Sequence, residues 1–146
     1  MRPYILLRIA SILMFIHALA HTVGHHGWKS GQNDTQRQVI GAMSSHFFPF
    51  MGVSRSMGDY FEGYGYACSL ALILFAYILW VSARETGTYH KKILAGISLC
   101  LCIWALVEFI YFFPVAALIT LGAGFLSLLA LILPKKTGEP TYSHDR

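Results

Sequence analysis

The sequence predicts an all-α integral membrane protein, a four-helix bundle with a short amphipathic helix in its first loop. The 146-residue chain is 55% hydrophobic and only 12% charged, with a mean hydropathy of +0.54. Soluble domains carry about twice that charged fraction. Four apolar stretches are each long enough to cross the hydrocarbon core of a bilayer, which takes about 20 helical residues. Lipid is therefore the expected solvent of most of the chain.

The spans are expected over residues 4–23, 60–82, 93–113 and 114–133, in a single membrane domain of residues 1–136. The last two stretches adjoin, and one helix over both would be about 60 Å long, twice the core thickness. Pro114 marks the break, because proline lacks an N–H and disfavours helix at the residue before it. We therefore expect a tight hairpin, followed by a short cytoplasmic tail over residues 137–146.

Small residues recur along the last span at four-residue steps, at Ala116, Thr120 and Gly124. Residues four apart share one face of a helix, and small side chains let two helices approach closely. This face is the expected contact of the last span with a neighbouring helix.

The distribution of Lys and Arg predicts the orientation in the membrane. One side carries Arg2, Arg84, Lys91, Lys92, Lys135, Lys136 and Arg146, and the other carries Lys29, Arg37 and Arg55. Seven against three places both termini in the cytoplasm, in the inner or plasma membrane of a bacterium. Ala18-Leu19-Ala20 after a basic N-terminus also resembles a signal-peptide cleavage site. We expect the first span to be retained, with Arg8 reaching outward to the interface.

The first loop, residues 24–58, contains a second helical pattern. Val39, Ile40, Met43 and Phe47 recur at helical spacing between Thr35 and Phe48. Asp34 is the expected N-cap, and Pro49 is expected to end the helix. We expect this amphipathic helix to lie on the membrane or to cover the bundle as a lid.

The histidines of the first span are the best candidates for chemistry. His17, His21 and His25 are four residues apart and so share one helix face. Each step climbs about 6 Å, so a neighbouring pair could chelate one metal ion, whereas His17 and His25 are too far apart.

Glu108 is the carboxylate of the third span. An intramembrane carboxylate is expensive and is expected to face the bundle interior with a partner. Counting residues from the outer ends of the spans places Glu108 in the same outer layer as His17 and His21. A histidine of the first span is its expected partner.

Three resemblances concern families. His21-Thr22-Val23-Gly24-His25-His26 resembles one histidine box of the membrane desaturases, which bind two irons, but those families carry several such boxes on the cytoplasmic side. In its architecture, the chain resembles small four-span bacterial membrane proteins of the DoxX-like kind. Its segments His46-Phe-Phe-Pro-Phe-Met-Gly and Gly63-Tyr64-Gly65 resemble segments of uncharacterised small bacterial membrane proteins. That resemblance implies the four spans and brings no activity. The layout of His and Glu in a helical bundle is also similar to sterol-isomerase-type membrane enzymes.

Three functions stay open. The first is a small membrane enzyme acting on a lipophilic substrate by acid–base chemistry, with Glu108 as donor or base, His17 and His21 in support, and His46 on the lid. The second is a Zn²⁺ or Fe²⁺ site of His17, His21 and Glu108, with His25 or His46 as fourth ligand. The third is a structural or accessory subunit in which these groups only fix helix packing.

Other classes are excluded or left without support. The basic residues lie at the ends of apolar runs rather than in a stripe, which argues against nucleic acid as a partner. No nucleotide-binding glycine motif is present. The three cysteines, Cys68, Cys100 and Cys102, are expected to be small buried hydrophobes. The expected partners are the lipid bilayer and a lipophilic small molecule.

Overall fold

The computed structural model describes residues 2–84 and 87–133. Four of its helices are long and apolar enough to cross a membrane, as predicted. They are α1 (Pro3–His26), α3 (Met57–Ser82), α4 (Thr88–Tyr111, with the candidate span over His90–Tyr111) and α5 (Pro114–Ile132). Between α1 and α3 lie a shorter helix, α2 (Asp34–Ser45), and two strands, β1 (Phe47–Phe50) and β2 (Val53–Ser56). The predicted tail, residues 137–146, lies outside the described residues.

The chain forms two compact units, and α1 and α3 each pass from one to the other. The loop unit comprises Met14–Phe75 and contains α2 and the two strands. The α4–α5 unit comprises Met1–Leu13 and Ala76–Arg146. The predicted single domain of residues 1–136 stays a prediction.

In the α4–α5 unit, the break between the last two spans lies where the sequence predicts it. Helix α4 ends at Tyr111, and Phe113 is extended, with φ of −136° and ψ of 148°. Pro114 is the first residue of α5, where its missing N–H costs no helical hydrogen bond. The predicted small-residue face of α5 is buried, together with Ala117, Ala123, Ser127 and Ala130.

Close packing in this unit depends on Gly124. A Cβ atom at this position would lie 3.0 Å from Cys102 Sγ and 3.3 Å from the Cys102 backbone nitrogen. A buried polar contact also joins the two helices, because the Ser98 and Ser127 hydroxyl oxygens lie 2.7 Å apart. Near the N-terminus of α1, the Arg8 guanidinium lies over the Trp80 ring, 4.2 Å from its centroid. This cation–π contact holds Arg8 close to the C-terminal end of α3.

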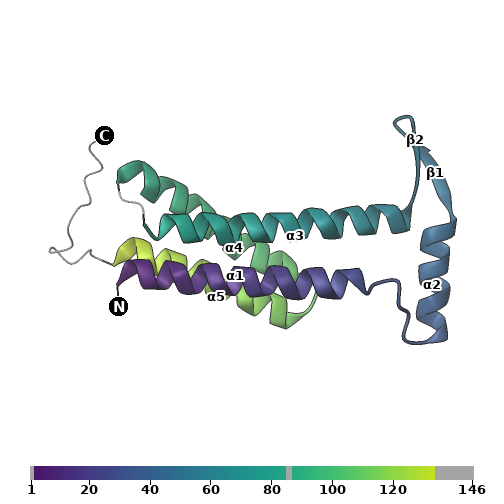
Figure 1. Cartoon of the computed structure of the whole chain (residues 1–146), viewed down its shortest axis with the longest axis horizontal. Helices are drawn as coiled ribbons and strands as arrows, with labels where there is room; N and C mark the ends of the chain where they lie inside the picture. Colours follow the sequence, from purple (N-terminus) through teal and green to yellow (C-terminus); the bar gives the residue numbers. More distant parts are fainter. Residues whose placement is uncertain (1, 85–86, 134–146) are drawn as a thin grey trace. The chain divides into compact units, whose positions relative to one another are not determined.

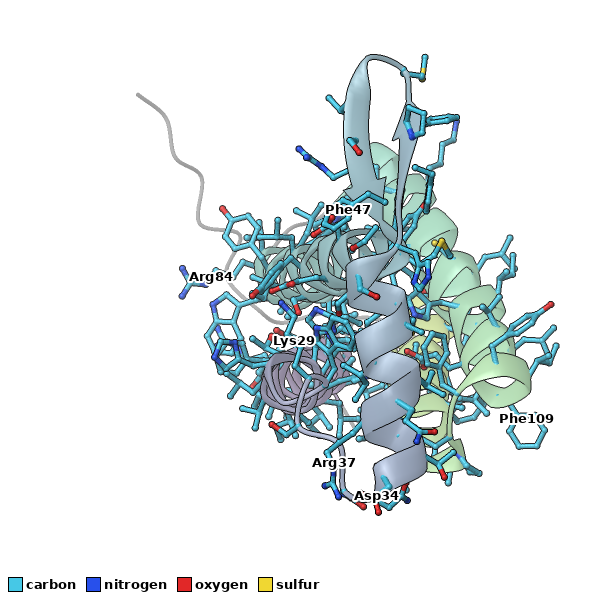
Figure 2. All side chains as sticks on the ribbon, turned by 90° about the vertical axis from the view of Figure 1, so that its right-hand side faces the viewer. Lys29, Asp34, Arg37, Phe47, Arg84 and Phe109 are labelled. Carbon is cyan, nitrogen blue, oxygen red and sulfur yellow. The ribbon has the colours of Figure 1, made fainter. Side chains whose placement is uncertain are left out.

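In the loop unit, α2 lies crosswise at the end of α1 and α3 (Figures 1 and 2). The Asn33 side chain caps α2 by accepting from the Gln36 N–H at 2.9 Å, so the N-cap is one residue before the Asp34 we expected. Asp34 instead accepts from Arg37 at 2.7 Å. The helix ends at Ser45 and not at Phe48, because the chain then enters a strand.

That strand belongs to an antiparallel β-hairpin that the sequence pattern did not predict. Phe48 pairs with Arg55 and Phe50 with Val53 across the two strands. The turn is Met51-Gly52, with φ of 49° and 85°. Positive φ at both central residues is the turn geometry that suits a two-residue hairpin, and it favours glycine at the second position. Pro49 lies within β1 instead of ending a helix, which is tolerated where its position needs no ladder N–H.

The hairpin leads directly into α3 through a reciprocal cap. The Ser56 N–H donates to Asp59 Oδ2 at 2.8 Å, and the Asp59 N–H donates to Ser56 Oγ at 3.1 Å. Each side chain thus satisfies a backbone donor that the helix leaves without a partner. In addition, Phe48 of the hairpin stacks on Tyr60 of α3, with ring centroids 5.8 Å apart.

Candidate functional site

The polar side chains of α1 meet α3 inside the loop unit. His25 lies against Gly65, where a Cβ atom would come within 2.0 to 2.2 Å of three atoms of the His25 ring. No residue but glycine leaves room there for the imidazole. His25 Nε2 lies 3.1 Å from the Glu62 carbonyl oxygen. Because a carbonyl only accepts, Nε2 carries a proton and donates it.

His21, one turn earlier, bonds to a different partner. Its Nδ1 lies 3.1 Å from Ser69 Oγ, and Ser69 Oγ lies 3.0 Å from the Thr22 hydroxyl. The Thr22 hydroxyl donates to the Ala18 carbonyl at 2.7 Å. These bonds form one chain from the ring of His21 to the backbone of α1.

The distances along this chain of bonds favour one nitrogen of neutral His21 as the one that carries the proton. Thr22 Oγ1 lies closer to the Ala18 carbonyl oxygen (2.7 Å) than to Ser69 Oγ (3.0 Å), and a carbonyl can only accept, so we assign the single Thr22 proton to Ala18. With the Thr22 proton assigned to Ala18, Ser69 donates to Thr22 and His21 Nδ1 donates to Ser69. The remaining nitrogen, Nε2, keeps its lone pair, and no group in residues 2–84 or 87–133 donates to it. His21 therefore presents an oriented, half-buried base.

The two rings lie on one face of α1, as their spacing predicts. His21 and His25 stack with centroids 6.0 Å apart and an angle of 11° between their planes. Phe61 and Tyr66 flank His25 at 5.6 and 5.4 Å. His25 is thus held by its Glu62 bond, by Gly65 and by two aromatic rings, whereas His21 is half-buried and bonded at one nitrogen.

Three predicted site residues remain, His17, Glu108 and His46. His17 is buried in α1, one turn before His21. Glu108 is buried in α4, in the α4–α5 unit, and its carboxyl group makes side-chain hydrogen bonds with Thr120 and Trp104. The pairing of Glu108 with a histidine stays a prediction.

His46 is exposed at the end of α2. Its Nδ1 lies 3.0 Å from the Ala42 carbonyl oxygen and 3.2 Å from Ser45 Oγ. It therefore caps the C-terminus of α2, and its role on a lid stays a prediction.

The described residues include no group of three or more His, Cys, Asp or Glu side chains arranged to hold a metal ion. The metal site of His17, His21, His25 and Glu108 stays a prediction.

An ion pair joins the loop after α1 to the N-terminal part of α3. Lys29 Nζ lies 2.6 Å from Glu62 Oε2, and this hydrogen bond raises the pKa of Lys29 above its ordinary value. Glu62 of α3 thus makes two contacts. Its backbone carbonyl accepts from His25 of α1, and its carboxylate pairs with Lys29 of the following loop.

Sequence reasoning missed the partners on α3. Gly65 and Ser69 are four residues apart and lie on the same helix face, opposite the histidines. The signal was a glycine and a hydroxyl residue at helical spacing in an otherwise apolar span. This spacing could be connected with the histidines only once the register between α1 and α3 was known.

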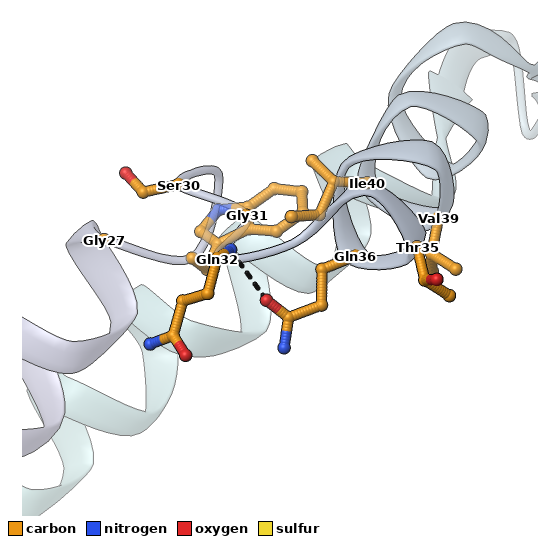
Figure 3. A pocket seen from close by; sticks show the side chains of 9 residues that line it. Gly27, Ser30, Gly31, Gln32, Thr35, Gln36, Val39 and Ile40 are labelled. Carbon is orange, nitrogen blue, oxygen red and sulfur yellow. Dashed lines mark hydrogen bonds between the residues drawn. The ribbon is translucent and has the colours of Figure 1, made fainter.

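An open cavity of about 470 Å³ lies between the loop that follows α1 and helix α2 (Figure 3). It is lined by Gly27, Trp28, Ser30, Gly31, Gln32, Thr35, Gln36, Val39 and Ile40. None of these nine side chains titrates near neutral pH, and none was predicted as a site residue. The cavity thus offers hydrogen bonds and apolar contact but no acid or base.

Comparisons with known proteins leave the site to be interpreted from its geometry. No family model, curated protein or solved structure matches the chain. The resemblance to DoxX-like membrane proteins stays a prediction.

Proposed function

We propose that this protein is a small membrane enzyme that moves a proton on a lipophilic substrate, with His21 as the base. The observation that carries the proposal is the bond between His21 Nδ1 and Ser69 Oγ at 3.1 Å. It holds the imidazole in the tautomer whose Nε2 lone pair is available. A catalytic histidine needs this arrangement, in which one nitrogen is oriented by a partner while the other meets the substrate.

The chemistry requires no bound group. His21 Nε2 takes a proton from a carbon of the substrate, and the C–H electron pair remains on the substrate in a conjugated system. The resulting imidazolium keeps its Nδ1–H bond to Ser69. Return of the proton to another carbon completes an isomerisation. The sequence argument adds Glu108 and His17 as polar groups at the same depth in the membrane.

The setting is proposed as a bacterial inner or plasma membrane. The four apolar helices support insertion, because each is long enough to cross the hydrocarbon core. The excess of Lys and Arg supports cytoplasmic termini, which places α2 and the β-hairpin on the outer face. There, α2 would lie along the membrane surface, since it runs crosswise to α1 and α3 (Figure 1).

Uptake of solvent deuterium tests the proposal for any lipophilic substrate present in the membrane. The purified protein is reconstituted in vesicles of total bacterial membrane lipid and incubated in D₂O. A base that returns its proton to carbon exchanges with solvent, so we expect a lipophilic component to gain deuterium, as read by mass spectrometry. His21→Ala should slow this gain by about 10²- to 10⁴-fold, the usual contribution of general acid–base catalysis.

Ser69 and His26 provide the comparison variants. Ser69→Ala removes the positioning bond and should slow the gain by about tenfold, the worth of one hydrogen bond. It should also change the ¹⁵N spectrum of His21, because Nδ1 is no longer held protonated. His26 is exposed at the same end of α1, so His26→Ala should exchange like the parent protein. Deuterium gain that is absent, or that survives His21→Ala, contradicts the proposal.

A further inference from the structure

A groove of about 350 Å³ runs along α3 on the side that faces away from α1. At about 100° per residue, Gly63 in the groove lies roughly 160° around the helix from Gly65, which contacts His25. The groove is therefore separate from the histidine site, and its ligand is independent of the acid–base chemistry. It is lined by Arg55, Asp59, Tyr60, Gly63, Tyr64 and Ala67.

The lower part of the groove is open and narrow. Its floor consists of Gly63 and Ala67, and no atom lies within 4 Å of where a Gly63 Cβ would be. Its walls are Tyr60 and Tyr64, and Tyr64 is 73% exposed. Because Phe48 of the hairpin stacks on Tyr60, one wall is held in position. This shape suits a thin apolar chain.

The upper end of the groove carries one cation and one anion. Arg55 pairs with Phe48 across the hairpin, so it shares the hairpin face that contacts Tyr60. Its guanidinium donates to the Ser54 carbonyl at 3.1 Å and makes no ion pair with another described residue. The exposed carboxylate of Asp59 accepts from the Ser56 N–H through Oδ2, and the charges of Arg55 and Lys29 act on it as well. An Arg and an Asp side by side complement a headgroup with both charges.

The length of the groove matches one leaflet. Arg55 lies two residues before α3 begins, at the level of the headgroups if α3 crosses the bilayer. Ala67 lies ten residues into the helix, about 15 Å deeper. That depth is half of the roughly 30 Å hydrocarbon core.

We propose that this groove binds one zwitterionic phospholipid whose headgroup carries a primary amine. Arg55 holds the phosphate through charge-assisted hydrogen bonds, and Asp59 accepts from the ammonium group. One acyl chain lies over Gly63 and Ala67 between the two tyrosines. A lipid with a net negative headgroup lacks the ammonium and meets the charge of Asp59 instead, so it binds more weakly.

A second copy of the chain is the competing occupant, because small residues four apart also favour helix pairing. Tyr64 argues against it, since its exposed ring stands beside Gly63 and keeps another helix backbone away. Pairing would also bury Arg55 and Asp59 without new partners, which is costly.

Native mass spectrometry of the detergent-solubilised protein tests the proposal. The parent protein is titrated with phosphatidylethanolamine and with phosphatidylglycerol, and bound lipid is counted per chain. We expect one phosphatidylethanolamine molecule to bind tightly to each chain and phosphatidylglycerol to bind more weakly. Arg55→Gln should lower the affinity for phosphatidylethanolamine by about tenfold or more, because a charge-assisted hydrogen bond to the phosphate is lost. Asp59→Asn keeps the oxygen that accepts from Ser56 and should abolish the preference between the two lipids.

Gly63→Leu fills the groove and should release the lipid. Gly96→Leu is the matched control, because Gly96 is an exposed helical glycine of α4 that also has no neighbour within 4 Å. Its lipid binding should equal that of the parent, with similar thermal unfolding in both glycine variants. If Arg55→Gln and Gly63→Leu retain as much lipid as the parent protein, the proposal is overturned. Equal binding of both lipids by the parent overturns it, as does a dimer that Gly63→Leu dissociates.

Discussion

At the scale of single residues, this protein depends on glycines that stand opposite bulky side chains. Gly65 is the clearest case, since the His25 ring occupies the space that any Cβ would need. His25 could be recognised from sequence as a polar residue on the histidine face of α1. Its partner Gly65 could not be recognised, because a glycine in an apolar span has no side chain whose chemistry would indicate a contact.

A matched pair of glycine variants tests this packing. In Gly65→Ala the new methyl group overlaps the His25 ring, so we expect a loss of about 1–3 kcal/mol in the free energy of unfolding, the usual cost of overpacking. Gly63→Ala, two residues earlier in the same helix, meets no atom within 4 Å. It should be neutral or stabilise by up to about 1 kcal/mol through helix propensity. Unfolding in detergent measures both, and equal stabilities would argue against the described position of His25.

At the scale of elements, periodicity and proline predicted the helices well. The Pro114 break and the buried face of α5 at Ala116, Thr120 and Gly124 are both found. The β-hairpin was missed because Phe47-Phe48 continue the helical spacing of Val39 and Met43. A methionine before Gly52 also hides a turn that is usually marked by asparagine or aspartate.

The contact between α4 and α5 gives a second matched pair. Gly124→Ala brings a methyl group to 3.0 Å from Cys102 Sγ and 3.3 Å from the Cys102 backbone. Because backbone cannot move aside as a flexible side chain can, we expect destabilisation by about 1–3 kcal/mol. At Gly122 the nearest atom is Leu13 Cδ1 at 3.8 Å, an ordinary contact, so Gly122→Ala should leave stability nearly unchanged. A Gly124→Ala protein as stable as Gly122→Ala would contradict this close approach.

At the scale of the whole molecule, composition predicted the four long apolar helices, and spacing predicted only part of the site. Four apolar stretches and Pro114 suffice for the four long helices. The face shared by His21 and His25 follows from their four-residue spacing. The bond from His21 to Ser69 did not follow, because residues 48 positions apart meet only through the register of two helices. Both proposals depend on these helices crossing a bilayer.

Cysteine labelling tests that central claim most directly. In a chain whose three native cysteines are replaced by serine, one cysteine is introduced at Met51, the exposed tip of the β-hairpin, or at Thr137 in the C-terminal tail. Spheroplasts are treated with a maleimide that cannot cross membranes. We predict that Met51→Cys is labelled in intact spheroplasts and Thr137→Cys only after permeabilisation. Labelling of both positions from the same side would contradict the four-span account and the outer position of the hairpin.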